Sequence, residues 1–264
     1  MKIVRTNKLL MFIVALTAAM NFSSCSDDND SYTWSGFVRV IGSYGSYLFV
    51  PFEGNSISPT NQSDLPSDLD TYAYITAYYD AENNEGSNSN YRYMEIYEVT
   101  PLKECSVSSE IDEMSTFSNI PIKSFSNNSS VESIVFNFIY HMFIPISYYC
   151  LDSDDADTHE FKMYYDLDEA TETTLTFHLR HNVDDASLNS SRLTCSNEYI
   201  YAKIDFPVYY YLVKFGSAPK YIKFDYPYNP DNAMMEEAEV FTLPDKIEYL
   251  EMYERLTADY DTSD

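Results

Sequence analysis

Apolar and polar residues alternate with a period of two through most of the chain from Trp34 onward. Successive side chains of a strand point to opposite faces, so this pattern is typical of strands with one buried face. The alternation is clearest in three segments of the second half: 131–144, which we expect to form one strand, 161–167 and 174–181. The sequence therefore predicts an all-β fold.

The first half of the chain predicts a small barrel. Proline, serine, asparagine and aspartate concentrate over 55–70, which we expect to be a long loop. Five short antiparallel strands in so few residues suit a five-stranded OB-like barrel spanning 34–118. The expected strands are 34–41, 47–52, 71–80, 91–99 and 105–109.

A polar junction separates this barrel from the second half. Pro121 and the Ser-Asn run 124–130 place the domain boundary near 118–122. Further strands expected within 199–215 and 220–226 favour a β-sandwich over 121–264. Asp245 and Glu248 form a capping-box pattern before helically spaced apolar residues, which predicts a short C-terminal helix on this β-sandwich.

The first 24 residues are typical of a secretory signal peptide. Basic residues precede an uncharged run from Leu9 to Met20, which is too short to span a bilayer as a helix. The segment Phe22-Ser23-Ser24-Cys25 resembles the lipobox of bacterial lipoproteins, in which the cysteine is acylated and becomes the mature N-terminus. Cys25 is therefore the expected lipidation site; the alternative is an ordinary signal peptide with a chance cysteine.

An acidic tether, residues 25–33, follows this signal. Its residues Ser26, Asp27, Asp28, Asn29 and Asp30 resemble the acidic export signal that sends lipoproteins to the outer face of some Gram-negative outer membranes. A solvated acidic linker is the alternative. The expected localisation is thus the outer membrane, lipid-anchored and surface-exposed.

The strong negative charge restricts the partners of the protein. The chain has 42 acidic and 16 basic residues, a formal net charge of −26. Such a chain repels nucleic-acid backbones and anionic membrane surfaces. We therefore expect no nucleic-acid partner, and membrane attachment only through the lipid on Cys25.

Three cysteines remain after Cys25, and an odd number cannot all pair within one chain. One disulfide and one buried thiol are possible, with Cys150–Cys195 considered first and Cys105 left over. Their spacing does not match a zinc site.

The sequence contains no motif for catalysis or cofactor binding. There is no GxSxG, P-loop or GxGxxG pattern. Asp152, Asp154, Asp155 and Asp157 fail the EF-hand pattern, which leaves a loose calcium site or a solvated loop. No enzyme, cofactor or metal ligand is therefore expected.

The histidines and tyrosines are more consistent with structural roles. His178 and His181 lie an odd number of residues apart on an expected strand, so they should face opposite sides. The run 209–211 of three tyrosines would present both faces of a strand and expose at least one ring. Aromatic residues of the barrel are expected in its core, or as a surface for sugar rings or peptide.

Several segments together resemble the NigD-like lipoproteins. These are Trp34-Ser35-Gly36-Phe37-Val38, Tyr72-Ala73-Tyr74-Ile75, Tyr93-Met94-Glu95-Ile96, Val99-Thr100-Pro101-Leu102 and, in the second half, Leu175 to Asn182. The resemblance implies an N-terminal OB-type barrel and a C-terminal β-sandwich, and it brings no catalytic residues. We expect a non-enzymatic cell-envelope binding or interaction module whose protein or glycan ligand is unknown. The alternative is a glycan-binding accessory lipoprotein of a nutrient-uptake system.

Overall fold

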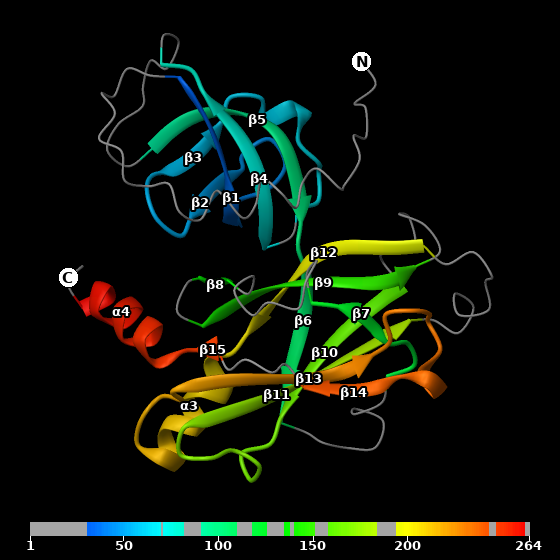
Figure 1. The fold of residues 1–264 in the computed structure, drawn as a ribbon. Coiled ribbons are helices and arrows are strands. Elements are labelled where there is room, and N and C mark those ends of the chain that lie inside the picture. Colours follow the sequence, from blue (N-terminus) through cyan, green and yellow to red (C-terminus); the bar gives the residue numbers. More distant parts are fainter. Residues whose placement is uncertain are drawn as a thin grey trace. The chain divides into compact units, whose positions relative to one another are not determined.

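A computed structural model of the chain confirms the all-β class and the short C-terminal helix (Figure 1). The chain forms two compact units, Met1–Leu102 and Lys103–Asp264. The structure describes residues 31–69, 71–81, 91–109, 118–125, 135–137, 140–150, 158–183, 194–242 and 247–261.

The first unit contains a closed five-stranded barrel in the order β1-β2-β3-β5-β4, with β4 pairing back to β1. Its strands are β1 (Tyr32–Ile41), β2 (Leu48–Pro51), β3 (Ser56–Pro59), β4 (Tyr72–Tyr79) and β5 (Tyr91–Pro101). A short 3-10 turn, Gln62–Asp64, follows β3. Inward-facing apolar residues such as Val38, Phe49 and Ile75 are fully buried and form the core of the barrel.

The fifth strand of the barrel is not the one predicted. β3 lies inside the segment 55–70 that we expected to be a loop, and it pairs parallel to β5. The expected fifth strand, 105–109, belongs to the other unit. A four-residue strand with two serines and a proline has too little apolar alternation to be recognised, because only Ile57 and Pro59 are buried.

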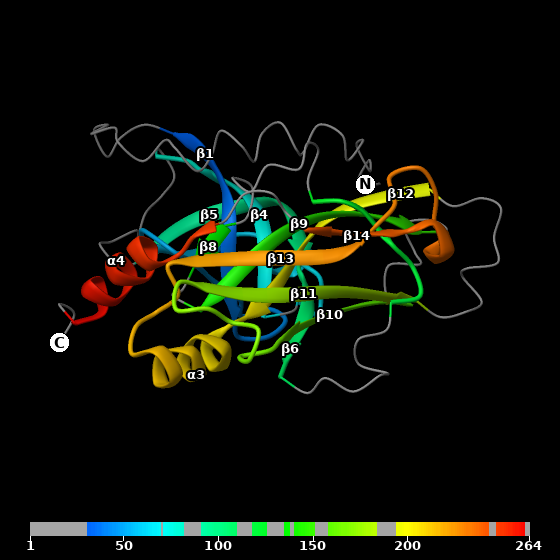
Figure 2. The same ribbon diagram turned by 60° about the horizontal axis from the view of Figure 1, so that its bottom comes forward.

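A single ten-stranded sheet forms the second unit, rather than the two separate sheets of a typical β-sandwich. The strand order is β11-β10-β6-β12-β9-β7-β13-β14, and β11 also pairs with β13, so the sheet returns on itself around one core. Figure 2 shows β11 and β13 side by side. The strands are β6 (Lys103–Ser108), β7 (Ile122–Ser124), β8 (Val135–Asn137), β9 (His141–Cys150), β10 (His159–Tyr165), β11 (Thr174–Val183), β12 (Thr194–Lys203), β13 (Tyr221–Tyr228), β14 (Glu239–Thr242) and β15 (Ile247–Glu248).

The predicted boundary near 118–122 is wrong because β6 is an interior strand of the second unit. It pairs in parallel with both β10 and β12, where Cys105 lies opposite Phe161 and Ala202. The boundary between the units along the chain therefore lies between Leu102 and Lys103. Pro121, which suggested the later boundary, directly precedes β7 inside the second unit, and most of the Ser-Asn run lies outside the described residues.

The segment 131–144 does not form one continuous strand. β8 and β9 pair antiparallel, with Asn137 opposite His141, so the chain reverses between them. Alternation alone could not reveal this reversal, because the apolar period continues on both sides of it.

A helix also replaces part of an expected strand. α3 (Asp205–Phe215) follows β12 directly and buries Pro207, Val208 and Tyr211. Pro207 suits a first helical turn, and Gly216 ends the helix with φ of 79°, where its N–H bonds to the Leu212 carbonyl oxygen. The prediction of strand at 209–211 is therefore wrong.

The C-terminal helix α4 (Leu250–Asp261) is confirmed, but not its capping box. Glu248 lies in β15, two residues before the helix, and Asp245 lies outside the described residues. A second 3-10 turn, Met235–Glu237, precedes β14.

The disulfide considered from the sequence is not formed. Cys105 and Cys150 are buried thiols. Cys150 lies opposite Thr194, whereas Cys195 occupies the next register position, opposite Tyr149. Consecutive positions of paired strands belong to opposite faces of the sheet, which disfavours a bridge between these two cysteines.

Candidate binding site at the mouth of the barrel

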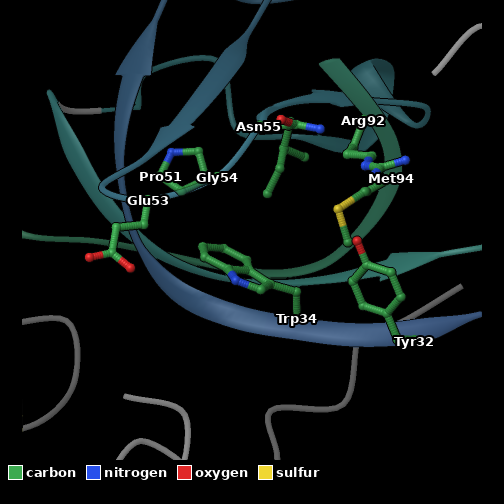
Figure 3. A pocket seen from close by; sticks show the side chains of 9 residues that line it. Tyr32, Trp34, Pro51, Glu53, Gly54, Asn55, Arg92 and Met94 are labelled. Carbon is green, nitrogen blue, oxygen red and sulfur yellow. The ribbon is translucent and has the colours of Figure 1, made fainter. Parts of the chain in front are cut away.

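A cavity of about 280 Å³ opens at one end of the barrel (Figure 3). Trp34 lies opposite Ala77 in the β1–β4 pair, and Ala77 is fully buried, so Trp34 occupies an inward-facing position. Tyr32, two residues earlier, shares this face at the end of the strand. The cavity is therefore the mouth of the barrel. Its lining is Tyr32, Trp34, Pro51, Glu53, Gly54, Asn55, Ile57, Arg92 and Met94.

The half-buried indole ring of Trp34 forms one wall of this cavity. The ring lies over Gly36, the next inward position of β1, and a Cβ atom on Gly36 would stand only 2.8 Å from the Cζ2 atom of the indole. The missing side chain at Gly36 therefore makes room for the ring to lie against its own strand. Trp34 is also the only tryptophan of the chain.

Arg92 places a positive charge at the mouth of the barrel. Its guanidinium carbon lies 5.4 Å from the centre of the Tyr79 ring, a cation–π distance. The ring of Tyr32 stacks on the same Tyr79 ring at a centroid distance of 5.1 Å. These aromatic contacts position the Arg92 side chain, which remains half-buried at an inward position of β5.

The connection between β2 and β3 supplies the other polar side chains. Glu53 is exposed and Asn55 is half-buried, and Gly54 between them has φ of 94°, which favours glycine. Figure 3 shows Glu53 and Arg92 on different sides of Trp34. The mouth thus combines a carboxylate acceptor, a guanidinium donor and an amide that can do both.

Tyrosines also cover part of the outer face of the barrel. Tyr91, Tyr93 and Tyr97 are exposed because the inward positions of β5 are taken by Arg92, Met94 and Ile96. The rings of Tyr78 and Tyr97 stack at 6.0 Å and are nearly parallel. These three tyrosines, Tyr91, Tyr93 and Tyr97, therefore lie on the surface of the barrel, which was the second of the two expectations for its aromatic residues.

The outer side of α3 is a second exposed aromatic surface. Phe206, Tyr209, Tyr210 and Val213 follow helical spacing and are all exposed, while Tyr211 is buried. The rings of Tyr209 and Tyr210 contact edge to face at 5.5 Å. The expectation that the tyrosine run exposes at least one ring is confirmed, although on a helix.

An ion cluster lies on the partly exposed face of β11 and β13. His178 Nδ1 is 2.6 Å from Asp225 Oδ2, and Arg180 Nη1 is 3.2 Å from Asp225 Oδ1. The hydrogen bond to Asp225 raises the pKa of His178 despite partial burial. Burial alone would raise the pKa of Asp225, but His178 and Arg180 together lower it. Among the described residues, the interactions of His178 in this cluster are with carboxylates, those of Asp225 and Glu169.

His181 lies on the opposite, fully buried face, as the odd spacing from His178 predicted. Its Nε2 is 2.8 Å from Nδ1 of His159, and its ring stacks on Phe161 at 4.4 Å. Burial, and then the proximity of His159, lower the pKa of His181 well below its usual value. The histidine therefore sits in the core as a neutral ring.

Several expected sites lie outside the described residues. These are the lipidation site Cys25, the export signal Ser26, Asp27, Asp28, Asn29 and Asp30, and the acidic loop with Asp152, Asp154, Asp155 and Asp157. Within the described part, no three His, Cys, Asp or Glu side chains gather as metal ligands would. None of the helices described there is long and apolar enough to cross a bilayer.

The residues that line the cavity were not predicted as a site, although the sequence holds two signals for them. Trp34 and Gly36 are two apart on a strand, so they share a face, and a glycine there permits a close ring contact. Arg92 alternates with Met94 and Ile96, which places a charge in line with core residues. The convergence with Glu53 and Asn55 depends on β3, which the sequence did not reveal.

Comparison with solved structures supports the architecture. A candidate lipoprotein from Bacteroides fragilis NCTC 9343 matches with a TM-score of 0.66 at 20% identity, over 83% of this chain and 98% of that chain. A NigD-like immunity protein from Bacteroides caccae matches with a TM-score of 0.48 at 18% identity, over 81% and 97% of the two chains. An uncharacterised protein from Parabacteroides merdae matches with a TM-score of 0.48 at 14% identity, over 80% and 99%.

At these identities the likeness concerns the fold. The fold is thus shared with the Bacteroides fragilis lipoprotein, and the solved structures that resemble this chain include a NigD-like immunity protein. No protein-family profile matches the sequence, and no curated protein does.

Proposed function

We propose that this chain is a non-enzymatic, lipid-anchored protein of the bacterial cell envelope that acts as a binding module, with its ligand site at the mouth of the N-terminal barrel. The observation that carries the proposal is the cavity whose lining includes the Trp34 ring together with Glu53, Asn55 and Arg92. Concave sites with an apolar wall and a few convergent polar groups are typical of ligand binding, and barrel mouths are a frequent location.

The cell-envelope assignment is supported separately. Cys25 and the acidic residues after it match a lipoprotein signal, and the fold is shared with a candidate lipoprotein. Outer-membrane attachment and surface display through Asp27, Asp28 and Asp30 are part of the proposal. Neither that lipoprotein nor the NigD-like immunity protein is named as an enzyme.

The emission of Trp34 tests the binding role, because this single tryptophan reports only on the mouth of the barrel. The mature chain is titrated with three sets of probes: sugars, amino acids and short peptides, and nucleosides. Saturable change with at least one set, lost in Arg92→Ala, is expected. No response to any set, with isothermal calorimetry equally silent, contradicts the proposal.

A glycan-binding accessory role is the second candidate. An aromatic ring beside a carboxylate, an amide and a guanidinium favours it, since these groups suit a ligand rich in hydroxyls. A role in a nutrient-uptake system is part of this second candidate, and genetic experiments would test it.

A further inference from the structure

We propose that the mouth of the barrel binds one ring of a neutral saccharide, with the ring face on Trp34 and the hydroxyls bonded to Glu53, Asn55 and Arg92. This inference rests on the proposed function and names the class of its ligand.

The wall of the cavity suits a sugar ring. Trp34 presents a flat indole beside two apolar side chains, Ile57 and Met94, which are buried. The axial C–H groups of a pyranose make one of its faces apolar, and that face packs against an aromatic ring. Gly36 lets the indole lie against β1, so the ring is held in place before any ligand arrives. Preorganisation of this kind lowers the entropic cost of binding.

The polar groups suit hydroxyls better than they suit a single fixed charge. A hydroxyl both donates and accepts, so it can bond to the carboxylate of Glu53, the guanidinium of Arg92 or either end of the Asn55 amide. Charge-assisted hydrogen bonds are the stronger ones, and both Glu53 and Arg92 provide them. Arg92 is positioned for this by its contact with Tyr79.

Charge and size narrow the ligand further. Glu53 and Arg92 offset each other within the cavity, while the chain as a whole carries −26, which disfavours anionic ligands such as nucleotides. The volume of about 280 Å³ is slightly below the roughly 300 Å³ at which ligand cavities usually begin. One neutral ring therefore fits these constraints, either free or at the end of a glycan.

The test uses the mature full-length chain in detergent, with the methyl glycosides of glucose, galactose, mannose and N-acetylglucosamine as probes. Titration should change Trp34 emission in a saturable way for at least one glycoside. Asn55→Ala and Arg92→Ala should each weaken that glycoside about tenfold, the effect of losing about 1.4 kcal/mol. Because Trp34→Ala and Trp34→Phe lack the fluorescent reporter, their binding is measured by calorimetry. Trp34→Ala should abolish binding, and Trp34→Phe should retain part of the affinity.

Tyr93→Ala is the matched control, because Tyr93 is an exposed aromatic on the outer face of β5. Its affinity should equal that of the unmodified chain, and thermal melts establish that every variant is folded. Equal affinity in the Asn55 and Arg92 variants overturns the inference. A response confined to peptides, amino acids or acidic sugars also overturns the inference, but it would still support the proposed binding function. Silence from all probes overturns both.

Discussion

Asp225 Oδ2 lies 2.6 Å from Nδ1 of His178, directly across the parallel pair β13 and β11. Arg180 approaches the other carboxylate oxygen of Asp225 at 3.2 Å, and Glu169 approaches Nε2 of His178 at the same distance. Two acids and two bases thus share a partly exposed surface, and their protonation links the stability of the second unit to pH.

His178→Gln should destabilise the protein most in mildly acidic solution. The raised pKa of His178 means that its stabilisation is complete below the unfolded value of about 6.5 and is lost as the pH rises through the folded value. The lowered pKa of Asp225 limits the effect on the acid side, since its contribution is lost as the pH falls below about 4. Urea unfolding should show a loss of about 1 to 2 kcal/mol near pH 5.5 and a smaller loss near pH 8.5. A loss independent of pH would contradict the assignment; Glu160→Gln, an exposed acid paired with Lys162, is the control.

His181→Phe should reduce the sensitivity of the fold to acid. The pKa of buried His181 is lowered, so below about pH 6.5 the unfolded chain takes up a proton that the folded protein resists, and stability falls with pH. Phenylalanine keeps a ring against Phe161 and cannot titrate. The free energy of unfolding should therefore drop less between pH 7 and pH 5 in the variant than in the unmodified protein. Parallel urea curves at the two pH values measure this, and an unchanged drop would show that His181 is not the group responsible.

Gly36→Ala should disturb the barrel mouth without any ligand present. The added Cβ would meet the Trp34 ring at 2.8 Å, so the indole must move into more exposed positions. We expect a red shift of the tryptophan emission and a loss of about 1 to 3 kcal/mol in stability. Ser35→Ala is the neighbouring control, because the Ser35 hydroxyl bonds to Thr76 on the outer face. An unshifted emission spectrum for Gly36→Ala would mean that the Trp34 indole does not pack against β1 at this position.

Separately expressed fragments should distinguish the observed unit boundary, between 102 and 103, from the boundary expected near 118–122. Residues 103–264 keep β6 between β10 and β12 and should fold with a cooperative melt. Residues 121–264 lack this interior strand, which leaves the edges of β10 and β12 unpaired, so they should aggregate or remain unfolded. Residues 31–102 should form the barrel alone, with the marginal stability of a small domain. Circular dichroism melts compare the three fragments; cooperative folding of 121–264 would restore the later boundary.

Cys25→Ala tests the anchor. If Cys25 carries the lipid, the variant should leave the membrane fraction and should no longer incorporate labelled palmitate. Unchanged membrane association and mobility would rule the anchor out. Replacing Asp27, Asp28 and Asp30 by alanine in the lipidated protein should reduce protease accessibility on intact cells, which tests surface display.

Long alternating strands were predictable from the sequence, whereas the short strand β3 and the partners of β6 were not. β4 and β11 alternate over eight and ten residues, so the period itself identifies them. β3 has four residues, and only its pairing with β2 and β5 makes it a strand. For β6 the strand was expected correctly, but its partners in β10 and β12 come from distant sequence that periodicity does not encode.

The helix α3 shows a different limit of the sequence. It carries apolar and aromatic residues on both its buried and its exposed sides, with Tyr211 inside and Phe206 outside. A helix of this kind lacks the polar face that normally identifies helical periodicity. Three consecutive tyrosines then favour strand by intrinsic preference, and the packing of Tyr211 in the core overrides that preference.

The place of β6 also sets the order in which the chain can fold. Glu104 of β6 accepts a hydrogen bond from Tyr201 of β12, 97 residues later in the chain. The first strand of the second unit therefore cannot complete its pairing until β12 is in place. Closing so large a loop is slow, whereas the barrel needs only contacts among its own strands. A chain that emerged from a secretion pore with its N-terminus first would therefore complete the barrel early, and the edge of β6 that pairs with β12 would stay unpaired until β12 emerged. For a chain exported in this way, the second unit would be exposed to chaperones and proteases for longer than the barrel.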